Sequence, residues 1–211
     1  MALKIATQPA VEPVSLADAK DYCRVDDSAY DSLITTLITV ARSAVEQYLR
    51  RALITQTWDL WLDGPGRGFP DPDRIIIDST SGYAYTGGDW PSAFIEVPLS
   101  PLQSITNVYF YQDNDVQQTW AATNYILDVA SEPGRIVLKR GQVWPQVLRP
   151  GNGLQIRFVA GYGGAGSNVP APITQALKLM IGHWLENRES QDMPPMAARM
   201  LDQYRIMRLG R

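Results

Sequence analysis

Residues 154–189 read LQIRFVAGYGGAGSNVPAPITQALKLMIGHWLENRE and contain the change of hydrophobic pattern that decides the fold. The apolar run over 154–160 is typical of a β-strand. Apolar residues over 173–185 recur at three- and four-residue steps, which predicts an amphipathic helix. A glycine-rich connection joins the two segments. The chain therefore passes here from a β region into a helical region.

The connection contains Gly161, Gly163 and Gly166 in the spacing GxGxxG, which is found in dinucleotide-binding loops. That function requires a helix directly after the glycines and then a second strand that ends near an acidic residue. Here SNVPAP separates Gly166 from the helix, and NRESQDMPP follows the helix in place of a strand. We interpret the segment as a flexible hinge between strand and helix, without a bound nucleotide.

The helical pattern returns at the start of the sequence. Ser15 is a good N-cap for a helix in LADAKDYCRV, and Asp26 or Asp27 can cap the next helix. Apolar residues at helical spacing predict a long helix over 30–52. Between the helical parts, two-residue periodicity and turn residues predict strands over 57–62, 75–77, 94–97, 105–111, 116–120, 125–128, 136–138 and 154–160. The fold class is therefore α+β, with short strands in an antiparallel sheet or small barrel.

Composition and charge exclude several classes of protein. The 211 residues are 45% hydrophobic and 19% charged, which is typical of a globular protein. There is no apolar run long enough to span a bilayer and no signal peptide, so we expect synthesis in the cytoplasm and no membrane contact. The single cysteine, Cys23, excludes an internal disulfide. The net charge of −3 argues against a protein that binds by neutralising phosphates.

Candidate catalytic and metal-binding residues are few. Cys23 and His183 form the one possible Cys/His pair, but Cys23 follows Leu16 and Ala19 at helical spacing and is better interpreted as a small core residue. Asp113 and Asp115 resemble the start of a calcium loop but lack its later ligands, so they predict a hairpin turn. We therefore expect no catalytic residue, no cofactor and no metal.

The C-terminal segment PMAARMLDQYRIMRLGR (195–211) is predicted to form a last helix with apolar and basic side chains. Met196, Met200, Tyr204 and Met207 lie on one stripe of that helix. Its four arginines, Arg199, Arg205, Arg208 and Arg211, outnumber its single acidic residue, Asp202. Methionine and arginine are both suited to protein interfaces. This composition favours an interaction or structural protein over an enzyme.

Several segments together resemble the head-to-tail connector proteins, also called adaptor or head-completion proteins, of long-tailed bacteriophages, prophages and gene transfer agents. The segments are PVSLADAKDYCRVD (13–26), RALITQTWDLWLD (51–63), PLQSITNVYFY (101–111), SEPGRIVL (131–138), IRFVAGYG (156–163) and VPAPITQALKLMIGHWLENRE (169–189). The loop over 63–91 is longer than the family usually carries, and Cys23 stands where an aliphatic residue is more typical.

The resemblance implies a domain organisation. Residues 1–52 and 170–193 would form a helical bundle, and residues 53–169, with the long loop 63–91, would be a β region inserted into it. Residues 194–211 would be a C-terminal portal-binding tail. The portal-binding residues would be Met196, Arg199, Met200, Tyr204, Arg205, Met207 and Arg208, and the interface-loop residues would be Gly161, Tyr162, Gly163, Gly164, Tyr83, Tyr85 and Trp90.

The resemblance also implies a function. The protein would be a structural component of the virion neck, made in the host bacterial cytoplasm. Identical subunits, usually twelve, would form a ring between the portal protein and a tail-side neck or stopper protein. DNA would pass through the ring without sequence-specific binding, and an acidic protein would not slow it. Two alternatives stay open: a tail-completion or neck protein that contacts the tail tube, and a small hydrolase of unfamiliar type.

Overall fold

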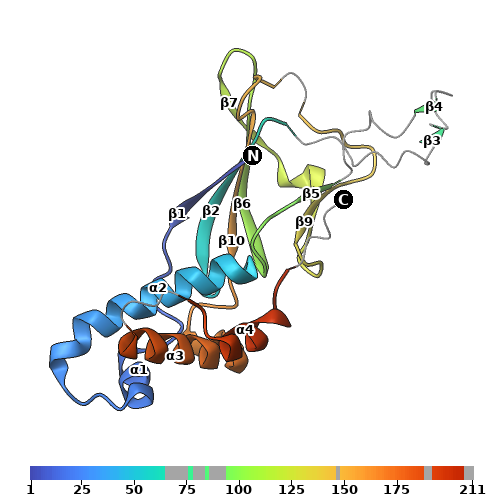
Figure 1. The fold of residues 1–211 in the computed structure, drawn as a ribbon. Coiled ribbons are helices and arrows are strands. Elements are labelled where there is room, and N and C mark those ends of the chain that lie inside the picture. Colours follow the sequence, from blue (N-terminus) through green and yellow to red (C-terminus); the bar gives the residue numbers. More distant parts are fainter. Residues whose placement is uncertain (65–75, 78–83, 86–93, 146–147, 188–191, 207–211) are drawn as a thin grey trace. The chain divides into compact units, whose positions relative to one another are not determined.

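The computed structural model describes residues 1–64, 76–77, 84–85, 94–145, 148–187 and 192–206, which form two compact units (Figure 1). We call them the β unit and the helical unit. The β unit comprises Met1–Ala6, Thr57–Val97 and Leu102–Val159. The helical unit comprises Thr7–Gln56, Pro98–Pro101 and Ala160–Arg211.

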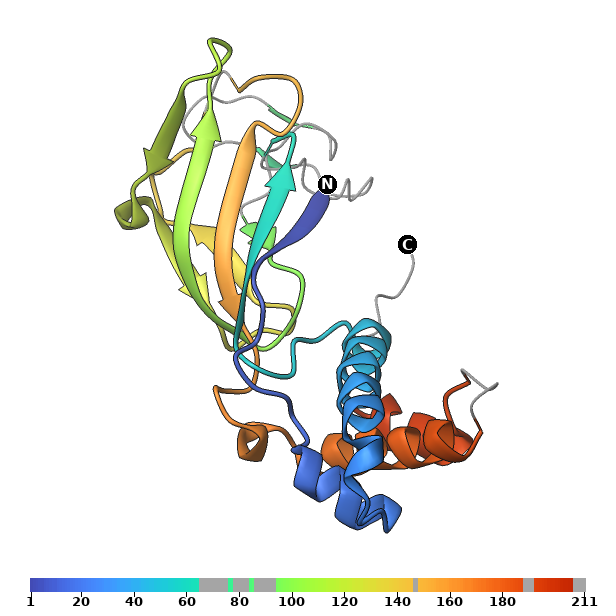
Figure 2. The ribbon, with the colours of Figure 1, turned by 90° about the vertical axis from the view of Figure 1, so that its left-hand side faces the viewer.

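A five-stranded sheet forms the larger part of the β unit. Its strand order is β1 (Ala2–Thr7), β2 (Gln56–Leu62), β10 (Leu154–Ala160), β6 (Leu102–Tyr111) and β7 (Gln117–Trp120). The strands β6 and β7 form an antiparallel hairpin in which Val108 is opposite Trp120. The arrow of β10 points opposite to those of β2 and β6 (Figure 2), so the centre of the sheet is antiparallel as well.

A second, three-stranded sheet completes the core of the β unit. Its order is β5 (Phe94–Glu96), β9 (Arg135–Leu138) and β8 (Tyr125–Asp128), and both pairs are antiparallel. The Trp120 ring at the end of β7 lies 5.2 Å from the Tyr125 ring and 4.9 Å from the Trp144 ring, measured between centroids. A short antiparallel pair, β3 (Ile76–Ile77) with β4 (Ala84–Tyr85), stands apart in its own two-stranded sheet.

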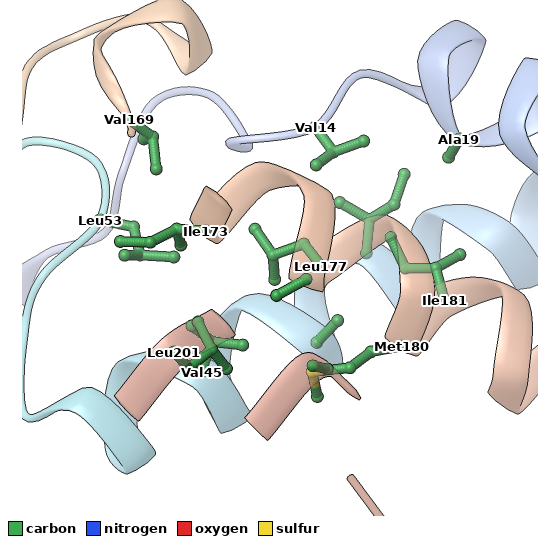
Figure 3. Packing of buried hydrophobic residues seen from close by; sticks show 14 of the residues in the cluster. Val14, Ala19, Val45, Leu53, Val169, Ile173, Leu177, Met180, Ile181 and Leu201 are labelled. Atoms are coloured by element: carbon green, nitrogen blue, oxygen red, sulfur yellow. The ribbon is translucent and has the colours of Figure 1, made fainter. Parts of the chain in front are cut away.

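Four α-helices make up the helical unit: α1 (Leu16–Cys23), α2 (Asp31–Leu49), α3 (Ala171–Glu186) and α4 (Pro195–Asp202). The Ser15 hydroxyl caps α1 by accepting the Asp18 backbone N–H at 3.0 Å. Apolar side chains from α2, α3 and α4 meet in one core, where Val45, Leu177 and Leu201 are almost fully buried (Figure 3). Burial of these apolar stripes is the main stabilising contribution.

The α+β class and the antiparallel sheets are confirmed. The strands β8 and β10 have the predicted bounds, and the helix predicted over 30–52 is α2. The strand β1 was not predicted, because its alternation of half-buried and exposed positions is short and rests on Leu3 and Ile5. The predicted extent of the last helix is wrong, since α4 ends at Asp202 and the described residues after it are not helical.

One ion pair joins the two central strands β2 and β10. The Arg157 guanidinium donates from Nε and Nη2 to the two carboxylate oxygens of Asp59, each at 2.8 Å. Asp59 is buried in the sheet, and the hydrogen bonds from Arg157 lower the pKa of its carboxyl although burial acts in the opposite direction. Such a bidentate pair fixes the register of two strands.

We predict that Asp59→Asn lowers the free energy of unfolding by about 1–2 kcal/mol, because it leaves Arg157 without its charged partner. Since the pKa of Asp59 is lowered, this contribution is complete above pH 3.8 and is lost as the pH falls further. Urea unfolding at pH 7 and pH 3 measures both effects. The control is Asp115→Asn, whose exposed carboxylate lies 3.4 Å from Arg149 and which we expect to change stability by less than about 0.5 kcal/mol. Equal effects of the two substitutions at pH 7 would contradict the prediction.

Candidate assembly interface

The glycine-rich segment is tied to the rest of the helical unit by backbone hydrogen bonds. The Gly161 N–H donates to the Pro101 carbonyl at 2.9 Å, and the Tyr162 N–H donates to the Leu53 carbonyl at 3.2 Å. The Gly163 carbonyl accepts the Thr55 N–H at 2.9 Å. These bonds hold residues 161–163 against residues 53–55. The interpretation of this segment as a flexible connection is therefore wrong.

The three glycines of the GxGxxG spacing stand where a side chain would collide with its neighbours. A Cβ atom on Gly161, whose φ is +135°, would lie 2.6 Å from the Ile54 carbonyl. A Cβ on Gly163 would lie 2.4 Å from the Asn168 side chain, and one on Gly166 would lie 2.7 Å from the Pro13 carbonyl. Close backbone packing explains this spacing, and the turn needs no phosphate to account for its glycines.

The C-terminal segment of the described chain is fixed to the other helices. Ala197 and Leu201 of α4 are fully buried in the helical core. After α4, the Tyr204 carbonyl accepts a hydrogen bond from Arg51 Nε at 2.6 Å, and the Ile206 N–H donates to the Leu49 carbonyl at 3.1 Å. The backbone as far as Ile206 is therefore part of the folded helical unit.

The predicted portal-binding residues divide into two groups. Met196 is 56% exposed and Arg199 is exposed, so both are available to a partner. Met200 and Tyr204 are half-buried and pack against the helical core. The Arg205 guanidinium lies 4.8 Å from the centroid of the Tyr48 ring. The remaining two residues of the prediction, Met207 and Arg208, lie outside the described residues.

Tyr48 fixes the end of α4 from the side of α2. Its hydroxyl donates to the Asp202 carboxylate, and this hydrogen bond raises the pKa of Tyr48. Arg205 stacks on the same ring. The acidic residue of the C-terminal segment and one of its arginines are therefore held against the Tyr48 side chain, and both stay exposed and charged.

The predicted interface-loop residues are spread over different environments. Gly161 is buried, Tyr162 and Gly163 are half-buried, and Gly164 is exposed with open space around it. Tyr85 lies in β4, and nothing is described of its side chain. The two other residues of this prediction, Tyr83 and Trp90, lie outside the described residues.

A buried polar cluster lies within the helical unit, and the sequence did not predict it. Glu46 is 13% exposed, and its Oε1 accepts hydrogen bonds from the Leu53 N–H at 2.9 Å and from Gln56 Nε2 at 2.7 Å. Its Oε2 pairs with Arg42 at 2.9 Å, and Arg42 Nε pairs with Glu12 at 2.7 Å. The available signal was the spacing of Arg42 and Glu46, four residues apart in an otherwise uncharged stretch of helix.

Burial makes Glu46 an uncommon carboxyl. Desolvation raises its pKa above the ordinary 4.5, although hydrogen bonds from Leu53 and Gln56 and the charge of Arg42 act to lower it. Perturbed carboxyls often occur in active sites, but every oxygen of this one is bound by groups of the fold itself. We interpret Glu46 as a structural residue that connects α2 to the chain after it.

Other side chains with catalytic potential also make contacts within the protein itself. Cys23 is half-buried against the helical core, and burial together with the nearby Glu186 raises the pKa of its thiol. His183 Nδ1 lies 3.3 Å from the Asn187 side-chain amide. Asp115 lies in the turn between β6 and β7, as predicted. Within the described ranges, no three His, Cys, Asp or Glu side chains are grouped so as to hold a metal, and no helix is long and apolar enough to cross a bilayer.

Comparison with known proteins supports the family resemblance. Residues 13–87 match the family model described as phage gp6-like head-tail connector protein. No curated protein matches the chain. Over residues 13–87 the chain is similar to the phage head-tail connector proteins. The predicted resemblance is confirmed, and the match begins at the same residue as the first of the segments that suggested it.

Solved structures share the fold over nearly the whole chain. A chain from the virion of a native gene transfer agent particle has a TM-score of 0.76 at 19% identity, with 99% of this chain and 97% of that chain covered. A chain from the neck of a native gene transfer agent particle, computed with C12 symmetry, has a TM-score of 0.71 at 22% identity with the same coverage. A chain from the neck of an empty particle, computed with C6 symmetry, gives 0.73 at 21% identity, again with that coverage.

We predict that Gly161→Ala destabilises the protein by about 2 kcal/mol or more, because the new Cβ meets backbone atoms at 2.6 Å and φ is +135°. Gly164→Ala is the matched control, since no atom lies within 4 Å of its Cβ position. We expect it to change stability by less than about 0.5 kcal/mol. Thermal unfolding of the two variants measures the difference, and equal melting temperatures would contradict the tight packing of residues 161–163.

We predict that Glu46→Ala lowers the free energy of unfolding by about 3 kcal/mol or more, because the Leu53 N–H loses its acceptor and the buried Arg42 keeps only Glu12 of its two carboxylate partners. Exposed Glu186→Ala is the control. The isosteric Glu46→Gln tests the pH dependence. Because the folded protein has the raised pKa, ionisation of Glu46 costs stability as the pH rises from 4.5 through that pKa. The stability of the wild type relative to Glu46→Gln should therefore decrease over this range, and an increase would contradict the burial of the carboxyl.

Proposed function

We propose that this protein is a structural head-tail connector in the neck of a phage-like particle. The observation that carries the proposal is the family match over residues 13–87. The fold that the chain shares with chains of gene transfer agent particles supports it over nearly the whole sequence. The cluster around Glu46 and the packing of Cys23 account for the unusual polar groups without a reaction. A structural role is therefore favoured over an enzymatic one.

The proposed assembly is a ring, twelve-membered when complete, between the portal protein and a tail-side neck protein. The neck structures that share the fold were computed with C6 and C12 symmetry, which supports a cyclic arrangement. The helical unit would be the helical bundle of the family, with residues 53–169 inserted into it. The net charge of −3 suits a lumen through which DNA slides, since phosphates gain little from binding an acidic wall.

The proposed portal contact is the outward side of α4 together with the residues that follow Ile206. Met196 and Arg199 offer an apolar and a basic group on a helix whose inner side is fixed by Ala197 and Leu201. A rigid helix that presents exposed methionine and arginine is a good anchor for a partner surface. Because Ala197 and Leu201 are core residues, deletion of the whole segment would damage the fold as well as the contact.

We predict that Arg199→Glu lowers binding to portal rings about fivefold or more, whereas the matched charge reversal Arg140→Glu, at an exposed site in the β unit, leaves binding unchanged. Co-sedimentation of the purified chain with portal rings of the same particle measures the bound fraction. A truncation after Ile206 tests the contribution of Met207 and Arg208 and keeps the hydrogen bond from Ile206 to Leu49, and circular dichroism checks that it is folded. Full binding by both variants would exclude this anchor and favour contact with the tail tube.

A further inference from the structure

The outward side of α2 carries no free charge. Over residues 32–49 the sequence has two charged residues, Arg42 and Glu46, and both bind inside the helical unit. The exposed positions of this stretch carry short polar or aliphatic groups, namely Ser32, Leu33, Thr35, Thr36, Thr39, Val40, Ser43 and Gln47. A solvent-facing helix normally carries charged residues on that side, and their depletion is a mark of interface cores.

Aliphatic residues form a row along one flank of this side. Leu33, Leu37, Val40 and Ala44 are separated by steps of four, three and four residues, so they follow one another along the helix surface. Leu33 is 37% exposed and Val40 is 48% exposed. This spacing is the one by which helices pack against each other. The row continues the apolar surface of α2 outward from the core, because Leu37 and Ala44 also pack against it.

The threonine hydroxyls beside this row need no outside partner. Thr35 Oγ1 donates to the Asp31 carbonyl at 2.8 Å, and Thr36 Oγ1 donates to the Ser32 carbonyl at 2.9 Å. Burial of a hydroxyl is costly when it loses its hydrogen bond to water, and these hydroxyls keep theirs within the helix. Covering these two hydroxyls would therefore cost little in desolvation.

We propose that this side of α2 is the surface on which a neighbouring copy of the same chain docks, and this rests on the proposed ring. We call it the α2 face: Ser32, Leu33, Thr36, Leu37, Val40, Ser43, Ala44 and Gln47. Nucleic acid does not fit it, since the face offers no cation to phosphates. A second copy is the occupant that this face suits. Copies of a chain with net charge −3 repel one another, so they make contact most easily through a face that carries no charge. In a ring of more than two subunits, the α2 face meets a different surface of the neighbour.

The test compares two variants, one with a carboxylate placed in the α2 face and one with a carboxylate placed on the β unit. Val40→Glu alters the face, and Val143→Glu is the matched control at an exposed valine of the β unit. Both valines are exposed, so both variants should fold, which circular dichroism checks. Self-association of each purified chain is measured by sedimentation velocity, and the copies of each variant per assembled particle are counted by quantitative mass spectrometry. We expect Val40→Glu to weaken self-association about tenfold or more and to deplete the particles, with Val143→Glu equal to the wild type.

Two results would overturn the proposal. One is that Val40→Glu self-associates as strongly as the wild type and is present in particles in the same number of copies. The other is that the wild type associates neither in solution nor in particles. The connector function fails separately. A wild-type chain that self-associates but is absent from particle necks and does not bind portal rings would leave the α2 face intact and remove the proposed function.

Discussion

The helical unit depends on one buried carboxylate. Glu46 stands near the end of α2, where the chain leaves the helix, and its two oxygens bind three groups from both sides of that exit. Through Arg42 the same cluster reaches Glu12, which precedes α1. A hydrophobic contact at this place would be simpler, but it would not satisfy the Leu53 N–H or fix the direction of the chain. The raised pKa of Glu46 measures the cost of this arrangement.

The next part of the structure is built on the segment that Glu46 holds. Leu53 donates its N–H to Glu46 and accepts the Tyr162 N–H on its carbonyl, while Thr55 donates to the Gly163 carbonyl. Residues 161–163 can approach residues 53–55 this closely because glycine at 161 leaves space for the Ile54 carbonyl. The position of α3 therefore follows from a sequence of backbone contacts that begins at a side chain of α2.

Much of this architecture could be predicted, because periodicity records burial. The three- and four-residue steps in α2 and α3 each reflect one apolar side facing a core. In β2 the alternation marks the strand but not its burial, since Asp59 is buried beside Leu60. Glu46 could not be assigned in the same way, since its partners lie seven and ten residues away on an irregular segment. The GxGxxG spacing was correctly separated from nucleotide binding, but its rigidity depends on contacts with residues 53–55 and Pro13 that no local pattern contains.

The extent of α4 shows how tertiary contacts override a local pattern. The stripe of methionines and Tyr204 predicts a helix beyond Asp202, yet Arg51 binds the Tyr204 carbonyl and Leu49 accepts the Ile206 N–H. Those two bonds replace helical hydrogen bonds and turn the chain along α2 instead. The Arg205 guanidinium then stacks on the Tyr48 ring and adds a side-chain contact to these backbone contacts. In the portal contact that we propose, a backbone fixed as far as Ile206 would lower the conformational entropy lost on binding.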